Sequence, residues 1–189
     1  MALLTIKKRK EYFQALGLGE YNEKNILKLQ KKYFSRKMDH DGIYGFDTDA
    51  LLRHIYACSQ VINFSPEEFK CECGGKYCTG YPVSMKLSTL KFMQRIRDYA
   101  GKPVFVTSGL RCKKYNKEIG GIDKSVHTQG KAVDYYIPSI TFNLTGRKQL
   151  INTIRTWKDH DWSYCNGYES GGGYRYSSTM GTSIHTQTK

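Results

Sequence analysis

The chain has 189 residues, 39% of them hydrophobic, which suits a packed core in one large domain or two small ones. No stretch approaches the roughly 18 consecutive apolar residues of a membrane span, so we expect no transmembrane segment. Thirty Lys and Arg against 17 Asp and Glu leave a formal charge of +13, which indicates a polyanionic partner such as nucleic acid, anionic lipid or an acidic wall polymer.

Three helices are predicted in the first third of the chain. KKRKEYFQALGLG supplies the first helix, which ends at Gly17 or Gly19. The second follows Tyr21, where apolar residues recur near helical spacing. After the turn DGIYG, Asp47 or Thr48 offers a side-chain cap for the third helix.

A second unit is predicted after residue 62. Ser65 is a helix cap with Pro66 at the first helical position, and we divide the chain into domains 1–62 and 63–189. SMKLSTLKFMQRIRDYAGK is amphipathic and ends at Gly101, which predicts a helix.

The rest of the chain mixes strands with helices. PVFVTSG and KAVDYYI are predicted strands, RCKKYNKEIGG a short helix or loop between them, and RKQLINTIRTWKDHDW a helix. The tail through His185 is expected to form strands and turns. This order favours the α+β class, with a three-helix domain followed by a domain built on an antiparallel sheet.

Six cysteines are present, and three of them lie close together in CECGGKYC. The six are Cys58, Cys71, Cys73, Cys78, Cys112 and Cys165. The cluster of Cys71, Cys73 and Cys78 is more typical of metal ligands or free thiols than of disulfides, with Cys112 as a possible fourth ligand. The usual C-x2-C spacing is absent, so a structural zinc, a disulfide and reduced thiols all remain open.

The stretch SVHTQGKAVD combines two residue types that bind zinc. His127 is expected on a loop and Asp134 on the strand that follows it, and Gly130 lets the backbone between them turn. Catalytic zinc sites use three protein ligands, with imidazole and carboxylate among the usual ones. His185, in a strand-like stretch near the end, is the best distant third ligand.

SVHTQGKAVD also resembles the S-x-H-x-x-G-x-A-x-D pattern of zinc D-Ala-D-Ala carboxypeptidases and endolysin peptidases. SGLRC and YNKEIGG add to this resemblance, which extends over residues 64–188. It implies one catalytic Zn²⁺ held by His127, Asp134 and His185. It also implies that Arg111 contacts the substrate carboxylate or the developing oxyanion, and that Ser125 orients the loop or Asp134.

The general base is where the sequence departs from this family. Many members carry E-x-x-H before the last ligand, but Thr182 stands at the position of that Glu. Glu169, Asp161 and His160 are the candidates near the tail. We favour Glu169, in the Gly-rich segment GYESGGGY that could fold over the metal, and an exposed loop carboxylate is the alternative reading of it. Gln187 likewise replaces an acid found in many relatives two residues after the histidine.

Residues 21–60 resemble the small three-helix peptidoglycan-binding domain. The matching residues are Leu29, Gln30, Asp41, Gly42, Ile43, Tyr44, Gly45 and Thr48, and Phe46 replaces the usual proline. A generic helical hairpin with the same turn chemistry is the alternative.

Together these features predict an endolysin-like zinc peptidase that cuts a peptide bond of bacterial peptidoglycan, assisted by attraction to anionic wall polymers. A D-Ala-D-Ala carboxypeptidase and a non-catalytic wall-binding protein are the alternatives. A nucleic-acid-binding protein is a further rival, but the scattered basic residues carry no such signature. MALLTIKKRKEYF lacks the order of a secretory signal, so we expect synthesis in the host cytoplasm.

Overall fold

The computed structural model describes residues 2–189 and has an α+β fold, which confirms the predicted class. The helices are α1 (Ile6–Ala15), α2 (Glu23–Tyr33), α3 (Phe46–Cys58), α4 (Leu87–Ala100), α5 (Lys113–Glu118) and α6 (Leu144–Ile154). The strands are β1 (Phe105–Ser108), β2 (Ala132–Tyr136), β3 (His160–Cys165), β4 (Tyr168–Glu169) and β5 (Ile184–Thr188). Over the described part of the chain, no helix is both long and apolar enough to cross a membrane.

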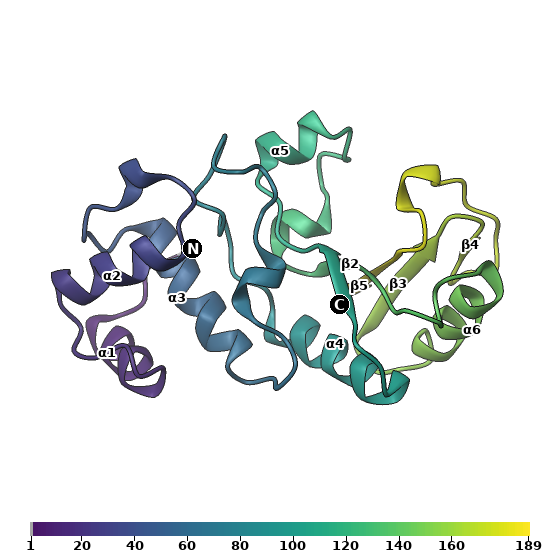
Figure 1. Cartoon of the computed structure of the whole chain (residues 1–189), viewed down its shortest axis with the longest axis horizontal. Coiled ribbons are helices and arrows are strands. Elements are labelled where there is room, and N and C mark those ends of the chain that lie inside the picture. Colours follow the sequence, from purple (N-terminus) through teal and green to yellow (C-terminus); the bar gives the residue numbers. More distant parts are fainter. Residues whose placement is uncertain (1) are drawn as a thin grey trace.

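The five strands form one antiparallel sheet in the order β1-β2-β5-β3-β4. Helices α1 to α3 lie at one end of the molecule and the sheet with α6 lies at the other, as Figure 1 shows. Helix α4 connects the two ends and contacts β5, where the hydroxyls of Thr89 and Thr188 lie 2.8 Å apart.

The third helix begins earlier than its predicted cap. Gly45 occupies the N-cap position without a side-chain bond, so Asp47 and Thr48 fall inside the first turn of α3 and the prediction that one of them caps it is wrong. Thr48 is used differently, because its hydroxyl lies 3.1 Å from the buried amide of Gln30. That amide also accepts from the backbone N–H of Gly42 at 2.8 Å and donates to Asp41 at 2.9 Å, which fixes the loop before α3.

The helix predicted over RKQLINTIRTWKDHDW is shorter than expected. Helix α6 ends at Ile154, and the final residues of that segment begin strand β3. Asp159 has φ of 71°, a left-handed conformation that a helix cannot contain. Pairing of β3 with β5, from His160 opposite Thr188 onward, stabilises a strand where the local pattern favours a helix.

A continuous apolar core joins the two predicted domains. It includes Phe13 and Leu51 from the first helices, Leu90 from α4 and Ile184 from β5, all of them buried. The predicted boundary at residue 62 lies in the connection between α3 and the short 3-10 helix Pro66–Phe69, and it stays a prediction.

Buried His54 on α3 is hydrogen-bonded to two segments of the second unit. Its Nε2 lies 3.0 Å from the Pro66 carbonyl oxygen, and the Met85 N–H donates to its Nδ1 at 3.3 Å. These partners require the neutral ring with hydrogen on Nε2. Burial lowers the pKa of His54 from 6.5 to about 4.

We expect acid to destabilise the protein through His54. The unfolded chain protonates this histidine near its ordinary pKa of 6.5, whereas in the folded chain the pKa is about 4. The contribution of neutral His54 to the free energy of unfolding is therefore complete above pH 6.5 and is lost as the pH falls from 6.5 to about 4. The loss reaches about 3 kcal/mol at the acid end. Urea denaturation at several pH values should show a shallower acid slope for His54→Gln; an unchanged slope contradicts the assignment.

Candidate metal centre

Three predicted ligands meet at the middle of the sheet. His127 lies on the short 3-10 helix Val126–Gln129, whereas Asp134 on β2 and His185 on β5 are directly opposite each other in the antiparallel pair. His185 Nδ1 lies 2.7 Å from Asp134 Oδ1 and 3.2 Å from His127 Nε2, and His127 Nε2 lies 3.4 Å from Asp134 Oδ1. Ligands about 2.0–2.1 Å from a tetrahedral zinc lie roughly 3.3–3.4 Å apart, so two of these separations match one face of such a site, and the His185–Asp134 pair would have to open by roughly 0.6 Å.

The loop that carries His127 depends on Gly130. Its φ is 69°, and a Cβ at this position would lie 2.2 Å from the Ser84 carbonyl oxygen, so the turn excludes any larger residue. His127 Nδ1 lies 2.7 Å from the Gly109 carbonyl oxygen and must donate to it. That bond leaves Nε2 unprotonated and directed at the centre, which is the tautomer a metal ligand needs.

Asp134 is held from its other side by Arg111. The guanidinium Nη2 donates to Asp134 Oδ2 at 2.6 Å, and Nε donates to the Ser108 hydroxyl at 2.9 Å. Arg111 therefore orients the carboxylate that faces the centre, a role the sequence analysis did not assign to it. Ser108 belongs to the SGLRC segment noted in the sequence but was given no role there, and the structure places it at the end of β1, paired with Asp134.

The electrostatics of the site favour the protonation states that bind a metal. Burial lowers the pKa of His127, so its ring is neutral near pH 7, with the Asp134 carboxylate opposing that shift. Burial by itself raises the pKa of Asp134, but the two histidines that face its carboxylate hold that pKa well below its usual range. A neutral imidazole and an ionised carboxylate can bind a cation without first losing a proton.

The remaining nitrogen of His185 faces Gln187. His185 Nε2 lies 3.5 Å from Gln187 Oε1, and Gln187 Nε2 donates to Asp161 Oδ2 at 2.6 Å. The amide thus occupies the position where relatives carry an acid, and it connects His185 to a carboxylate on β3. Sequence reasoning noted the substitution but not this connection.

The Tyr164 ring, with Arg175 over it, lies beside the centre and is called the aromatic wall below. The Tyr164 ring stacks on His185 with 4.7 Å between centroids, and Arg175 lies over the Tyr164 ring at 4.1 Å. Glu169 is opposite Tyr164 in the β3–β4 pair, so it shares the sheet face of His185 but is separated from it by a strand. Its carboxylate is 3.8 Å from Arg175 Nη1, and within residues 2–189 it makes no hydrogen bond to the three ligands.

Ser125 is buried before the His127 helix, where its carbonyl oxygen accepts from Thr128. Among the described side chains, those that hydrogen-bond to Asp134 are Arg111 and His185, so Ser125 makes no such bond. Its predicted part in orienting the loop stays a prediction.

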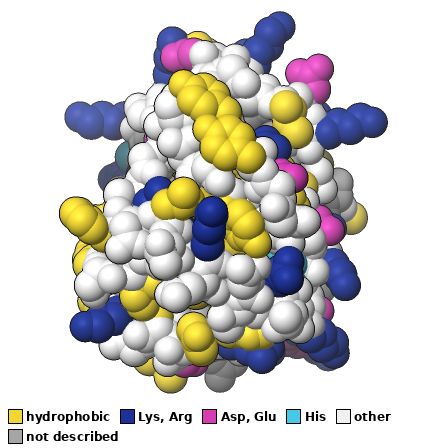
Figure 2. All heavy atoms as spheres, turned by 90° about the vertical axis from the view of Figure 1, so that its right-hand side faces the viewer, with side chains coloured by type: hydrophobic (Ala, Val, Ile, Leu, Met, Phe, Trp, Pro, Cys, Tyr) yellow, Lys and Arg dark blue, Asp and Glu magenta, His cyan; other side chains and the backbone are white. Residues whose placement is uncertain are grey.

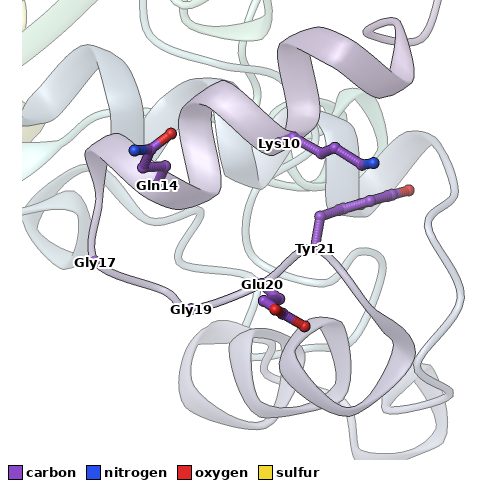
Figure 3. A pocket seen from close by; sticks show the side chains of 6 residues that line it. All are labelled: Lys10, Gln14, Gly17, Gly19, Glu20 and Tyr21. Carbon is purple, nitrogen blue, oxygen red and sulfur yellow. The ribbon is translucent and has the colours of Figure 1, made fainter.

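A surface pocket of about 800 Å³ lies far from this chemistry, at the end of the molecule formed by α1 (Figure 1). It is lined by α1 and the turn that follows, with Lys10, Gln14, Glu20 and Tyr21 around it (Figure 3). It contains neither a ligand set nor a nucleophile, and we assign it no role in the reaction.

Two buried histidines and a buried carboxylate converge from a loop and two strands, and they are the kind of donor set that catalytic zinc sites use. A model of the Peptidase M15 family matches residues 62–160, more than half of the chain, and the chain belongs to this family. The match includes His127 and Asp134 but ends before His185, so the third ligand rests on the structure. Comparison with curated proteins and with solved structures gave no significant match.

We expect His127→Ala and His185→Ala each to lower the zinc content by one ion per chain, because two remaining ligands bind zinc too weakly to survive dialysis. Elemental analysis of the purified proteins measures this. His160→Gln is the matched control, since His160 is also buried in the sheet but bonds to Ser163, away from the centre. Zinc retained by both alanine variants would contradict the ligand set.

Proposed function

We propose that this M15 peptidase hydrolyses a peptide bond in bacterial peptidoglycan, as a phage endolysin does. The observation that supports this most is the His127, Asp134 and His185 centre in a chain of this family. D-Ala-D-Ala carboxypeptidase activity, which needs the same centre, is the alternative form of the proposal.

The chain's own residues account for much of what hydrolysis requires. When bound, zinc acts as a Lewis acid and lowers the pKa of a water molecule, which makes a nucleophile available near neutral pH. The Gly109 carbonyl and Gln187 hold the two imidazoles in orientation from outside. Arg111, with its side chain 15% exposed beside Asp134, also has donors for a substrate carboxylate or a developing oxyanion.

Two carboxylates compete for the role of general base. Glu169, the predicted base, lies on the same sheet face and is linked to the aromatic wall through Arg175. Asp161 reaches His185 through the Gln187 amide. We retain Glu169, because a base must approach the reacting water, and a carboxylate that acts through an amide cannot accept that proton directly.

In this proposal the amino-terminal helices supply a wall-binding surface, since their loop motif resembles that of peptidoglycan-binding domains. A pocket of about 270 Å³ is lined by residues of this loop, Asp41 and Gly45 among them. Ile43 and Phe46 beside it are 66% and 70% exposed, and apolar groups at a pocket rim suit the faces of sugar rings. Gly42 and Tyr44 shape the loop, the latter by donating to Asp49 at 2.9 Å.

The charge of the protein suits an anionic wall. Figure 2 shows that Lys and Arg side chains project around the end formed by β3, β4 and α6, with few acidic side chains among them. With a formal charge of +13, the protein is attracted to polyanions, so association with acidic wall polymers accompanies the proposed substrate. As an endolysin it would be made in the host cytoplasm and act at the wall.

Purified peptidoglycan should be degraded by the wild type and not by His127→Ala, since loss of the metal removes the nucleophile. Mass spectrometry of the released muropeptides identifies the bond: loss of terminal D-Ala alone indicates a carboxypeptidase, and separated stem peptides indicate an endopeptidase. Wall binding by a zinc-loaded wild type that cleaves nothing would favour the non-catalytic alternative.

Glu169→Gln should lower kcat by about 10²- to 10⁴-fold if Glu169 is the base, with zinc content unchanged. Asp161→Asn is the matched comparison, because it removes one negative charge from the same end of the sheet. If the Asp161 variant loses that activity and the Glu169 variant keeps it, the assignment of Glu169 is wrong.

A further inference from the structure

We propose that Cys71, Cys73, Cys78 and Cys112 bind a second zinc ion that has a structural role. All four side chains are buried, and their sulfur atoms lie within 4.8 Å of one another. They form a cluster separate from the apolar core, with Tyr77 and Tyr115 packed against it. Four buried sulfur atoms around one point are the donor set that a closed tetrahedral zinc site requires.

The spacing of the sulfur atoms suits a metal. Cys73 Sγ and Cys78 Sγ lie 3.4 Å apart, against roughly 3.8 Å for sulfur ligands 2.3 Å from a tetrahedral zinc. A disulfide bond, at about 2.0 Å, would draw the same atoms much closer. The four thiols therefore approach each other as ligands do and need only small side-chain movements to close around an ion.

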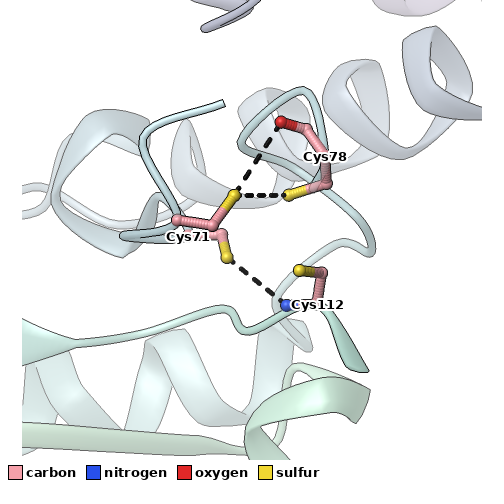
Figure 4. Close-up of side chains that lie close together, drawn as sticks. Cys71, Cys78 and Cys112 are labelled. Atoms are coloured by element: carbon pink, nitrogen blue, oxygen red, sulfur yellow. Dashed lines mark hydrogen bonds between the residues drawn. The ribbon is translucent and has the colours of Figure 1, made fainter. Parts of the chain in front are cut away.

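Backbone N–H groups are directed at these sulfur atoms. The Cys112 N–H donates to Cys71 Sγ at 3.4 Å (Figure 4). The Tyr115 N–H donates to Cys112 Sγ at 3.4 Å. Such donors stabilise a thiolate over a thiol, and the thiolate is the form that binds zinc.

The loop between the cysteines is shaped to bring its three sulfur atoms together. Gly74 and Gly75 have φ of 61° and 89°, and the Lys76 N–H donates to the Cys73 carbonyl oxygen at 2.9 Å, which closes a tight turn. Arg36 packs against Gly75.

This second site connects to the peptidase centre through the neighbouring backbone. The Leu110 N–H donates to the Phe69 carbonyl oxygen at 2.8 Å, and a Cβ on Gly109 would lie 2.6 Å from Phe69 Cα, so the two segments lie in contact. Gly109 accepts the hydrogen bond of His127, and Arg111 holds Asp134. Zinc at the four cysteines would therefore clamp the 71–78 loop to the segment that orients two of the catalytic ligands.

Metal analysis of the full-length protein tests the proposal without reference to its substrate. The wild type should hold two zinc ions per chain, and Cys112→Ser should hold one. His127→Ala should also hold one, but after exchange with cobalt that ion should show sulfur-to-metal charge-transfer absorption, which Cys112→Ser should lack. Cys112→His, which restores a ligand, should return the content to two.

Cys58→Ser is the matched control, since Cys58 is buried beside His54, outside the cluster, and it should keep both ions. If Cys112→Ser fails to fold, the cobalt spectrum of His127→Ala decides the question alone. The proposal is overturned if His127→Ala holds no metal, or if mass spectrometry finds the four cysteines joined as disulfides. Failure of wall hydrolysis would leave this result unchanged, so the two proposals are tested independently.

Discussion

The carboxylate of Asp134 is the group on which the rest of the site depends. It is buried, accepts from Arg111 on one oxygen, and meets His185 and His127 on the other. A buried carboxylate without such partners would cost several kcal/mol, so each neighbour is needed for the ionised form to persist. The geometry of the proposed zinc site follows from satisfying this one charge.

The sheet explains why those neighbours are where they are. Ser108, Asp134, His185, Tyr164 and Glu169 are successive cross-strand partners, so they form a row over five strands on one face. Cross-strand partners lie about 5 Å apart, which brings adjacent members of the row into contact and keeps distant ones apart. Proximity to the centre is thus set by strand order rather than by distance along the chain.

Local residue chemistry allowed much of this to be predicted. Gly130, between His127 and Asp134, is required by a left-handed turn that touches Ser84, and the amphipathic pattern ending at Gly101 correctly predicted α4. The contacts that could not be predicted are tertiary. Nothing near Arg111 or Gln187 in the chain indicates that they meet Asp134 and Asp161, and the pairing of β3 with β5 replaced a locally favoured helix.

The position of β5 in the sheet has a consequence for how the chain folds. It is the last strand in the chain but lies at the centre of the sheet, between β2 and β3. Until it inserts, β1 with β2 and β3 with β4 can form only two separate antiparallel pairs, whose inner edges are unpaired. Completion of the sheet and convergence of Asp134 with His185 are therefore one event, which closes contacts between residues far apart in the chain.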